Sequence, residues 1–190
     1  MLSYYANKEI KQVLNSIDNK TPNGKRNLAM FTIATYLGLR REDIRTLKLE
    51  SIDWNNDLIN ICQSKNSELI TLPLFNEIRY ALLDYLKNAR PDIISEYVFI
   101  QKDGTLYSEN YLSTIFNDIF SLSGIDLKER KYSCHTLRHS LATNMLANKK
   151  DMHVISKALG HSNTDITKNV YITYDENKLR ELSLEVPAWN

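Results

Sequence analysis

The sequence is poor in the residues that mark several specialised classes of protein. Its 2 cysteines, Cys62 and Cys134, form no spaced cluster, so neither a disulfide framework nor a zinc site is indicated. With 5 glycines, 4 prolines and no internal repeat, no linker between domains is indicated either. No apolar run approaches the roughly 18–20 residues that span a bilayer, and the first residues lack the apolar centre of a signal peptide. We therefore expect a protein of the reducing cytoplasm with no membrane partner.

Net charge is also small: +1 at neutral pH, which is weak for a protein that binds nucleic acid. The distribution of the charges is more informative, because basic residues gather in two stretches. These are Lys25, Arg26, Arg40, Arg41, Arg45 and Lys48, and then Lys128, Arg130, Lys131 and Arg138. Taken alone, such runs are typical of a solvated surface. The length of 190 residues and a hydrophobic share of 43% predict a single globular domain over residues 1–190.

Apolar spacing predicts a mostly α fold with one small sheet, an α+β arrangement. Apolar residues three and four positions apart predict helices over 7–17, 25–37, 42–47, 75–89, 108–123, 136–148, 151–159, 164–170 and 176–184. The β-rich runs 52–54, 58–62 and 69–72 are separated by turn residues and predict a three-stranded antiparallel sheet. Thr21-Pro22-Asn23-Gly24 is interpreted as a turn, and Gly38 as the C-terminal cap of the second helix.

Three polar segments carry the chemistry. Arg40 lies at a break between two predicted helices. His135 and Arg138, at positions i and i+3 of a helix, share one face, which we expect to point outward. Leu159-Gly160-His161 is followed ten residues later by Tyr171. Each segment alone is a common surface or packing feature, but chance explains the ordered set poorly.

This set resembles the signature of the tyrosine recombinases, which include phage and transposon integrases. The matching pattern covers residues 25–174 and includes Gly38-Leu39-Arg40, His135-Thr136-Leu137-Arg138 and Leu159-Gly160-His161. The resemblance implies the catalytic-domain fold of that family, a bacterial, phage or mobile-element origin, and double-stranded DNA as partner. It also implies a monomer in solution that forms a homotetramer on paired DNA sites.

The resemblance has implications for both ends of the chain. Most tyrosine recombinases carry an N-terminal core-binding domain that clamps the other side of the DNA, and we expect that domain to be absent from these residues. The chain is then either an excised catalytic domain or a short recombinase. The C-terminal tail, residues 175–190, either packs on its own domain or docks on a neighbouring protomer, as tails in this family commonly do.

The resemblance assigns phosphate-binding and proton-moving roles to four residues. Arg40 and Arg138 would clamp the nonbridging oxygens of one phosphodiester with their fork-shaped donors. His135 and His161 would donate hydrogen bonds or move protons, since the unperturbed pKa of histidine, about 6.5, permits either role near neutrality. His135 is the preferred general base.

Three more residues complete the implied site. Tyr171 would be the nucleophile, with Tyr174 as the second choice. Lys65, on the turn between two strands, would be the general acid that protonates the departing 5′ oxygen, with Lys102 as a weaker alternative. Asp43, three residues after the first arginine, would orient site groups rather than react.

No cofactor is implied, because the arginines supply the charge that a magnesium ion would otherwise provide, and no Gly-rich phosphate loop indicates ATP. The expected function is therefore site-specific recombination through a covalent 3′-phosphotyrosine intermediate. Two alternatives remain: a noncatalytic DNA-binding regulator that keeps the phosphate clamp, and a type IB topoisomerase-like enzyme that relaxes DNA. His139, His153 and Cys134 are interpreted as structural residues, with His139 pointing away from the phosphate.

Overall fold

The computed structural model describes residues 4–65, 67–127, 130 and 132–147, and the helices and strands below are those of these residues. They are α1 (Asn7–Ser16), α2 (Pro22–Leu37), α3 (Arg41–Arg45), a 3-10 turn (Leu49–Ser51), β1 (Ile52–Asp53), β2 (Leu58–Cys62), β3 (Leu69–Pro73), α4 (Asn76–Asn88), α5 (Glu109–Leu122) and α6 (Cys134–Ala147). None of these helices combines the length and the apolar character that crossing a bilayer requires. The helices predicted beyond residue 148, and the tail, lie outside the described residues.

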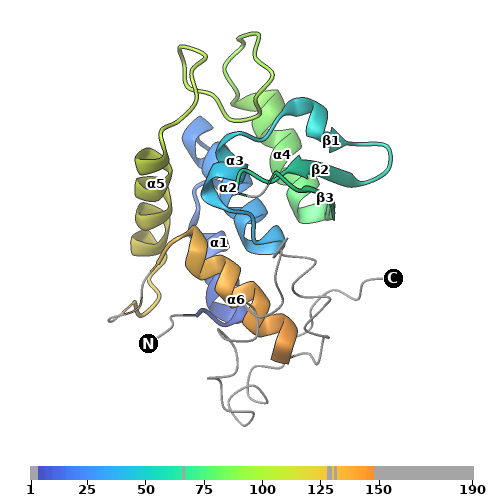
Figure 1. The fold of residues 1–190 in the computed structure, drawn as a ribbon. Coiled ribbons are helices and arrows are strands. Elements are labelled where there is room, and N and C mark those ends of the chain that lie inside the picture. The colour runs from blue at the N-terminus through green and yellow to red at the C-terminus, as the bar shows by residue number, and fades with distance from the viewer. Residues whose placement is uncertain (1–3, 66, 128–129, 131, 148–190) are drawn as a thin grey trace.

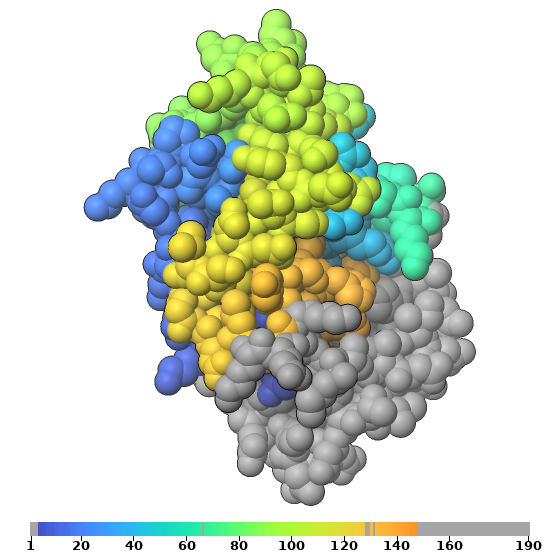
Figure 2. Space-filling view, turned by 90° about the vertical axis from the view of Figure 1, so that its left-hand side faces the viewer, coloured from blue at the N-terminus to red at the C-terminus, as the bar shows by residue number. Residues whose placement is uncertain are grey.

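Helix α2 is the central element of the fold. It packs against α4 and α6, and also contacts α1, α3 and α5 (Figure 1). Apolar residues occur around most of its circumference, which is typical of a helix buried on several sides. Phe31 of α2, for example, lies 5.5 Å from the rings of both Phe116 and Phe120 of α5. Figure 2 looks onto the α5 side and shows α6 directly below α5. Because α2 is held from several directions, its C-terminal end has a fixed position.

The three-stranded antiparallel sheet has the order β1-β2-β3, as predicted. Its register pairs Ile59 with Leu72 and Ile61 with Ile70, so four buried apolar side chains share one face and join the common core. The sheet lies on the side of the molecule away from α5 (Figure 1). The β2–β3 turn carries Lys65, which is exposed.

The predicted turn over Thr21-Pro22-Asn23-Gly24 is wrong, because α2 already begins at Pro22. Thr21 is the N-cap, and its hydroxyl accepts a hydrogen bond from the Gly24 N–H at 3.0 Å. Pro22 takes the first helical position, where a missing N–H leaves no hydrogen bond unmade. Gly24 is required there, since a Cβ atom would lie 1.6 Å from the carbonyl oxygen of Asp18. The same residues that resemble a turn therefore start a helix.

Candidate functional site

The junction between α2 and α3 positions the first predicted site residue. Gly38 closes α2 with a φ of 59°, in the left-handed region that glycine tolerates, and its N–H donates to the Ala34 carbonyl at 3.1 Å. Leu39 is 1% exposed and anchors the junction in the core. Arg40 is the extended N-cap residue of α3. Its side chain therefore leaves a rigid backbone at the helix break, and 24% of it is exposed.

Two hydrogen bonds join this junction to the start of α6. Arg138 Nη1 donates to the Gly38 carbonyl at 2.7 Å, and Cys134 Sγ donates to the Leu39 carbonyl at 3.1 Å. Consecutive carbonyls of one segment are thus bonded by two residues one turn apart on one helix, which fixes both the distance and the orientation of the two elements. Arg40 and Arg138, which are far apart in the sequence, are brought together in this way.

The prediction that His135 and Arg138 both face outward is wrong for Arg138. His135 is exposed, but Arg138 is 5% exposed. The reason is the bond to Gly38, since the carbonyls at the C-terminal end of α2 lack partners within their own helix and carry its partial negative charge. A guanidinium that bonds one of them has to lie beneath the junction. The backbone contact holds this arginine in one orientation.

Asp43 links Arg40 to the turn that carries Lys65. Its side chain is fully buried on α3, and its Oδ1 accepts the Ser64 N–H at 2.8 Å. Its Oδ2 lies 3.9 Å from Arg40 Nη1, and neither of these two atoms has a hydrogen bond within the part of the chain that the structure describes. A buried carboxylate needs such a cation beside it. The contact with Ser64 holds the adjacent Lys65 on the Arg40 side of the sheet.

Three cations act on the His135 imidazole. The pKa of His135 is lowered from 6.5, first because the ring is partly withdrawn from water, and then by the charges of Arg138, Arg40 and Lys65. These charges come from α6, from the α2–α3 junction and from the β2–β3 turn, so the three elements converge on one ring. His135 is therefore neutral at pH 7, as a proton acceptor must be. Of the two lysines considered as general acid, Lys65 is the one whose charge acts on His135.

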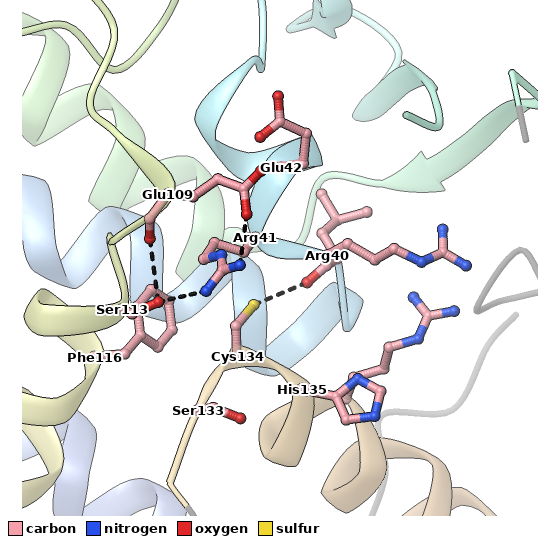
Figure 3. Close-up of a pocket in the computed structure, with 11 residues that line it drawn as sticks. Arg40, Arg41, Glu42, Glu109, Ser113, Phe116, Ser133, Cys134 and His135 are labelled. Carbon is pink, nitrogen blue, oxygen red and sulfur yellow. Dashed lines mark hydrogen bonds and ion pairs between the residues drawn. The ribbon is translucent and has the colours of Figure 1, made fainter. Parts of the chain in front are cut away.

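A pocket of about 310 Å³ opens beside this cluster (Figure 3). It is lined by Leu39, Arg40, Arg41, Glu42, Glu109, Ser113, Phe116, Ser133, Cys134, His135 and Arg138. Arg41 crosses toward α5, where its Nη2 contacts Glu109 Oε2 at 2.6 Å and its Nη1 donates to the Ser113 hydroxyl. In Figure 3 the consecutive Arg40 and Arg41 side chains point in opposite directions. Arg41 is thus bonded to α5, and Arg40 extends on the side of His135.

Cys134 cannot compete as a nucleophile. It is 6% exposed, and burial raises the pKa of its thiol to about 12. The thiol is therefore protonated at neutral pH, and it donates to a backbone carbonyl of the junction. Its part in the site is to hold α6 against Leu39.

Comparison with known proteins places the chain in a family. Residues 4–178, most of its length, match the phage integrase family. The chain belongs to this family. The tyrosine recombinase XerH of Campylobacter jejuni is 29% identical over 182 residues, which are 93% of this chain and 50% of XerH. The tyrosine recombinase XerD of Listeria monocytogenes is 29% identical over 179 residues, which are 92% of this chain and 59% of XerD.

The chain spans about half the length of these two curated relatives of the phage integrase family. A shorter relative, the integrase/recombinase y4gC of Sinorhizobium fredii, is 28% identical over 170 residues, which are 90% of this chain and 88% of y4gC. Among solved structures, XerH site-specific recombinase bound to its difH substrate, in a pre-cleavage complex, has a TM-score of 0.75 and 26% identity. That match covers 94% of this chain and 53% of the XerH chain. The predicted tyrosine recombinase catalytic-domain fold is confirmed.

Among the family residues predicted for the site, His161 and Tyr171 lie outside the described residues, as do Tyr174 and His153. The others, from Arg40 to Arg138, belong to the described cluster. The sequence-based interpretation missed one contact in it. His139 Nε2 lies 2.9 Å from His135 Nε2. The i, i+4 spacing of the two histidines was the available signal, since residues four apart on a helix are neighbours.

Proposed function

We propose that this phage integrase family protein is a site-specific DNA recombinase that cuts and rejoins strands through a covalent 3′-phosphotyrosine at Tyr171. The observation that carries the proposal is that Arg40, His135 and Arg138 line one pocket, where Arg138 is fixed by its bond to the Gly38 carbonyl and the charge of Lys65 also acts on His135. Fixed cationic donors around a neutral imidazole suit a single backbone phosphate of DNA. The structure of the related XerH with its difH substrate supports the same substrate class for this chain.

The two arginines would stabilise the charge that grows on the phosphate during attack. A phosphodiester carries one negative charge, and its nonbridging oxygens gain more as a fifth oxygen approaches. Arg138 is held by Gly38, and Arg40 by a rigid junction with Asp43 behind it. Donors that are already in place when charge develops are usually the largest catalytic contribution. They supply the positive charge that a metal ion provides in metal-dependent nucleases, so we propose cleavage without metal or ATP.

The proton steps follow from the remaining residues. The Tyr171 oxygen bonds to phosphorus while its proton passes to the neutral His135. The bond from phosphorus to the 5′ oxygen breaks, and that oxygen takes a proton from Lys65 and leaves as a hydroxyl. His161 donates a further hydrogen bond to the phosphate. Since the phosphotyrosine ester retains the energy of the broken bond, a 5′ hydroxyl of another strand can reverse every step and rejoin the DNA.

The test of this function is adduct formation on a duplex that is nicked next to the cleavage position. After cleavage the short fragment with the released 5′ hydroxyl diffuses away, so the strand cannot be rejoined. We expect a covalent protein–DNA band on denaturing gels, in the presence of EDTA and without ATP. The noncatalytic alternative predicts specific binding with no such band. The topoisomerase alternative predicts relaxation of supercoiled plasmid that lacks any recombination site.

Replacing Lys65 with alanine should slow cleavage of ordinary DNA by about 10²–10⁴, the usual contribution of a general acid. On DNA with sulfur in place of the bridging 5′ oxygen the rate should be restored, because a thiolate leaves without a proton. Single-turnover cleavage of the two substrates measures this difference. Lys102→Ala is the matched control and should cleave both as the unaltered chain does. Equal slowing of both substrates by Lys65→Ala would contradict the acid role.

We further propose that four chains assemble on two paired DNA sites, from a monomer in solution, with the tail of residues 175–190 on a neighbouring protomer. Recombination exchanges four strands, so one nucleophile is needed for each. Particle masses on paired sites should correspond to four chains and two duplexes. A complex that never exceeds two chains would contradict the tetramer. The proposed place of action is the bacterial cytoplasm, where the DNA lies.

A further inference from the structure

His139 contacts the general base directly. It follows His135 by one turn on α6, and the two Nε2 atoms are 2.9 Å apart, a hydrogen-bond distance. The ring centroids lie 4.4 Å apart with the planes at 89°, so the edge of one ring points at the other. His139 is half-buried, whereas His135 reaches the surface. The bond therefore connects an exposed ring to a half-buried one.

Two nitrogens this close must share a single hydrogen. The pKa of His139 is lowered to about 4, mainly by burial and further by the charges of His135 and Arg138. The pKa of His135 is lowered as well, by partial burial and by Arg138, Arg40 and Lys65. Both rings are thus neutral near pH 7, and each neutral imidazole offers one donor and one acceptor. One Nε2 carries the hydrogen, and the other accepts it.

The shared bond determines which atom of His135 remains for the reaction. Whichever ring donates, Nε2 of His135 is engaged, so Nδ1 is its other nitrogen for the phosphate or the nucleophile. When His135 donates through Nε2, Nδ1 has a lone pair and can accept a proton. When His139 donates, Nδ1 of His135 carries a hydrogen and can only donate. A base therefore requires the first arrangement.

We propose that His139 is a positioning residue for His135: it holds the His135 ring through Nε2, presents Nδ1 to the reacting groups, and accepts the Nε2 hydrogen bond when His135 is charged. This inference rests on the proposed function, in which the Tyr171 proton passes to His135; the shared bond makes Nδ1 the atom that accepts it. The imidazolium then has two N–H groups, and Nε2–H donates to neutral His139. A histidine that becomes charged in the reaction needs such an acceptor, as serine proteases illustrate with an aspartate. His139 neither gains nor loses a proton.

His139→Phe removes the bond and keeps a ring of similar size on the helix. We expect single-turnover cleavage to slow by about 10- to 100-fold, the loss that is typical when the partner that orients a metal-bound histidine is removed. DNA affinity should not change, because His139 touches no phosphate in this proposal. His139→Gln, whose side-chain oxygen can accept the same hydrogen, should recover most of the rate. A purely packing role would give the opposite order, with phenylalanine the milder change.

The pH profile of cleavage distinguishes more sharply between a positioning role and a purely packing role of His139. Cleavage requires neutral His135, so the rate is lost as pH falls through the pKa of that group. An acceptor at Nε2 favours charged His135 and raises its pKa, so its removal in His139→Phe should move the acidic midpoint to lower pH. In a His135→Ala background, His139→Phe should cause no further loss. An unmoved midpoint, or an equal loss in that background, would overturn the proposal.

Nitrogen-15 spectra of the histidine rings in the full-length protein test the pair without any DNA chemistry. We expect the His135 signals to show one predominant neutral tautomer in the unaltered chain and a mixture of both in His139→Phe. Identical His135 signals in the two proteins would overturn the inference even if the enzyme cleaves DNA. Conversely, absence of any DNA adduct from the unaltered chain would contradict the proposed function, whatever the spectra show of the histidine bond.

Discussion

Replacing Arg40 with alanine will slow DNA cleavage by about 10²–10³, the typical effect of removing one fixed donor from a developing negative charge. Buried Asp43 loses its neighbouring cation in this variant, so thermal unfolding is measured alongside the cleavage rate. We expect the fold to survive, because Asp43 keeps its hydrogen bond from the Ser64 N–H and, among the described residues, the Arg40 side chain makes no hydrogen bond to another element. Single-turnover cleavage of the nicked duplex, at protein concentrations that saturate the DNA, measures the chemical step apart from binding.

Arg41→Ala is the matched control for this change, since it removes the same side chain from the next position. Its guanidinium bonds Glu109 and Ser113 of α5 rather than lying beside His135. We expect little change in the cleavage rate and a small loss of stability, about 0–1 kcal/mol for a partly exposed ion pair. Equal loss of cleavage in both variants would mean that general positive charge matters, and not a phosphate clamp at Arg40.

Tyr171→Phe should abolish the covalent DNA adduct completely. Phenylalanine keeps the ring but has no oxygen to bond to phosphorus, so neither cleavage nor rejoining can begin. Tyr174→Phe is the control three residues away and should retain the adduct. Denaturing gels with labelled DNA compare the two, while a binding assay verifies that both variants still occupy the site. Loss of the adduct in Tyr174→Phe alone would move the nucleophile to that position.

Much of the fold could be predicted because the signals were local. The strands over 58–62 and 69–72 follow from alternation between turn residues, and their pairing buries Ile59 against Leu72 as an antiparallel hairpin should. The Gly38 cap also follows from local chemistry, since its φ of 59° favours glycine. Local spacing and turn residues were sufficient for these elements.

The rest depended on contacts between distant segments. Arg138 is buried because a carbonyl of another helix, at Gly38, accepts its hydrogen bond, and no local pattern shows that partner. At the start of α2 the Asp18 carbonyl closely approaches Gly24. The sequence Thr21-Pro22-Asn23-Gly24, which is typical of a turn, does not show this contact. The spacing of His135 and His139 was visible, but the bond between their rings depends on the side-chain conformations that bring the two Nε2 atoms within 2.9 Å, and the spacing alone does not give these.

Mass spectrometry of the trapped protein–DNA complex tests the covalent mechanism most directly. After nuclease and trypsin digestion, peptide 169–178 should carry a nucleotide, and fragment ions between positions 171 and 174 should place it on Tyr171. The linkage should be to a 3′ phosphate, with a free 5′ hydroxyl on the released strand. A nucleotide on any other residue, or a 5′-phosphate linkage, would contradict the proposed chemistry.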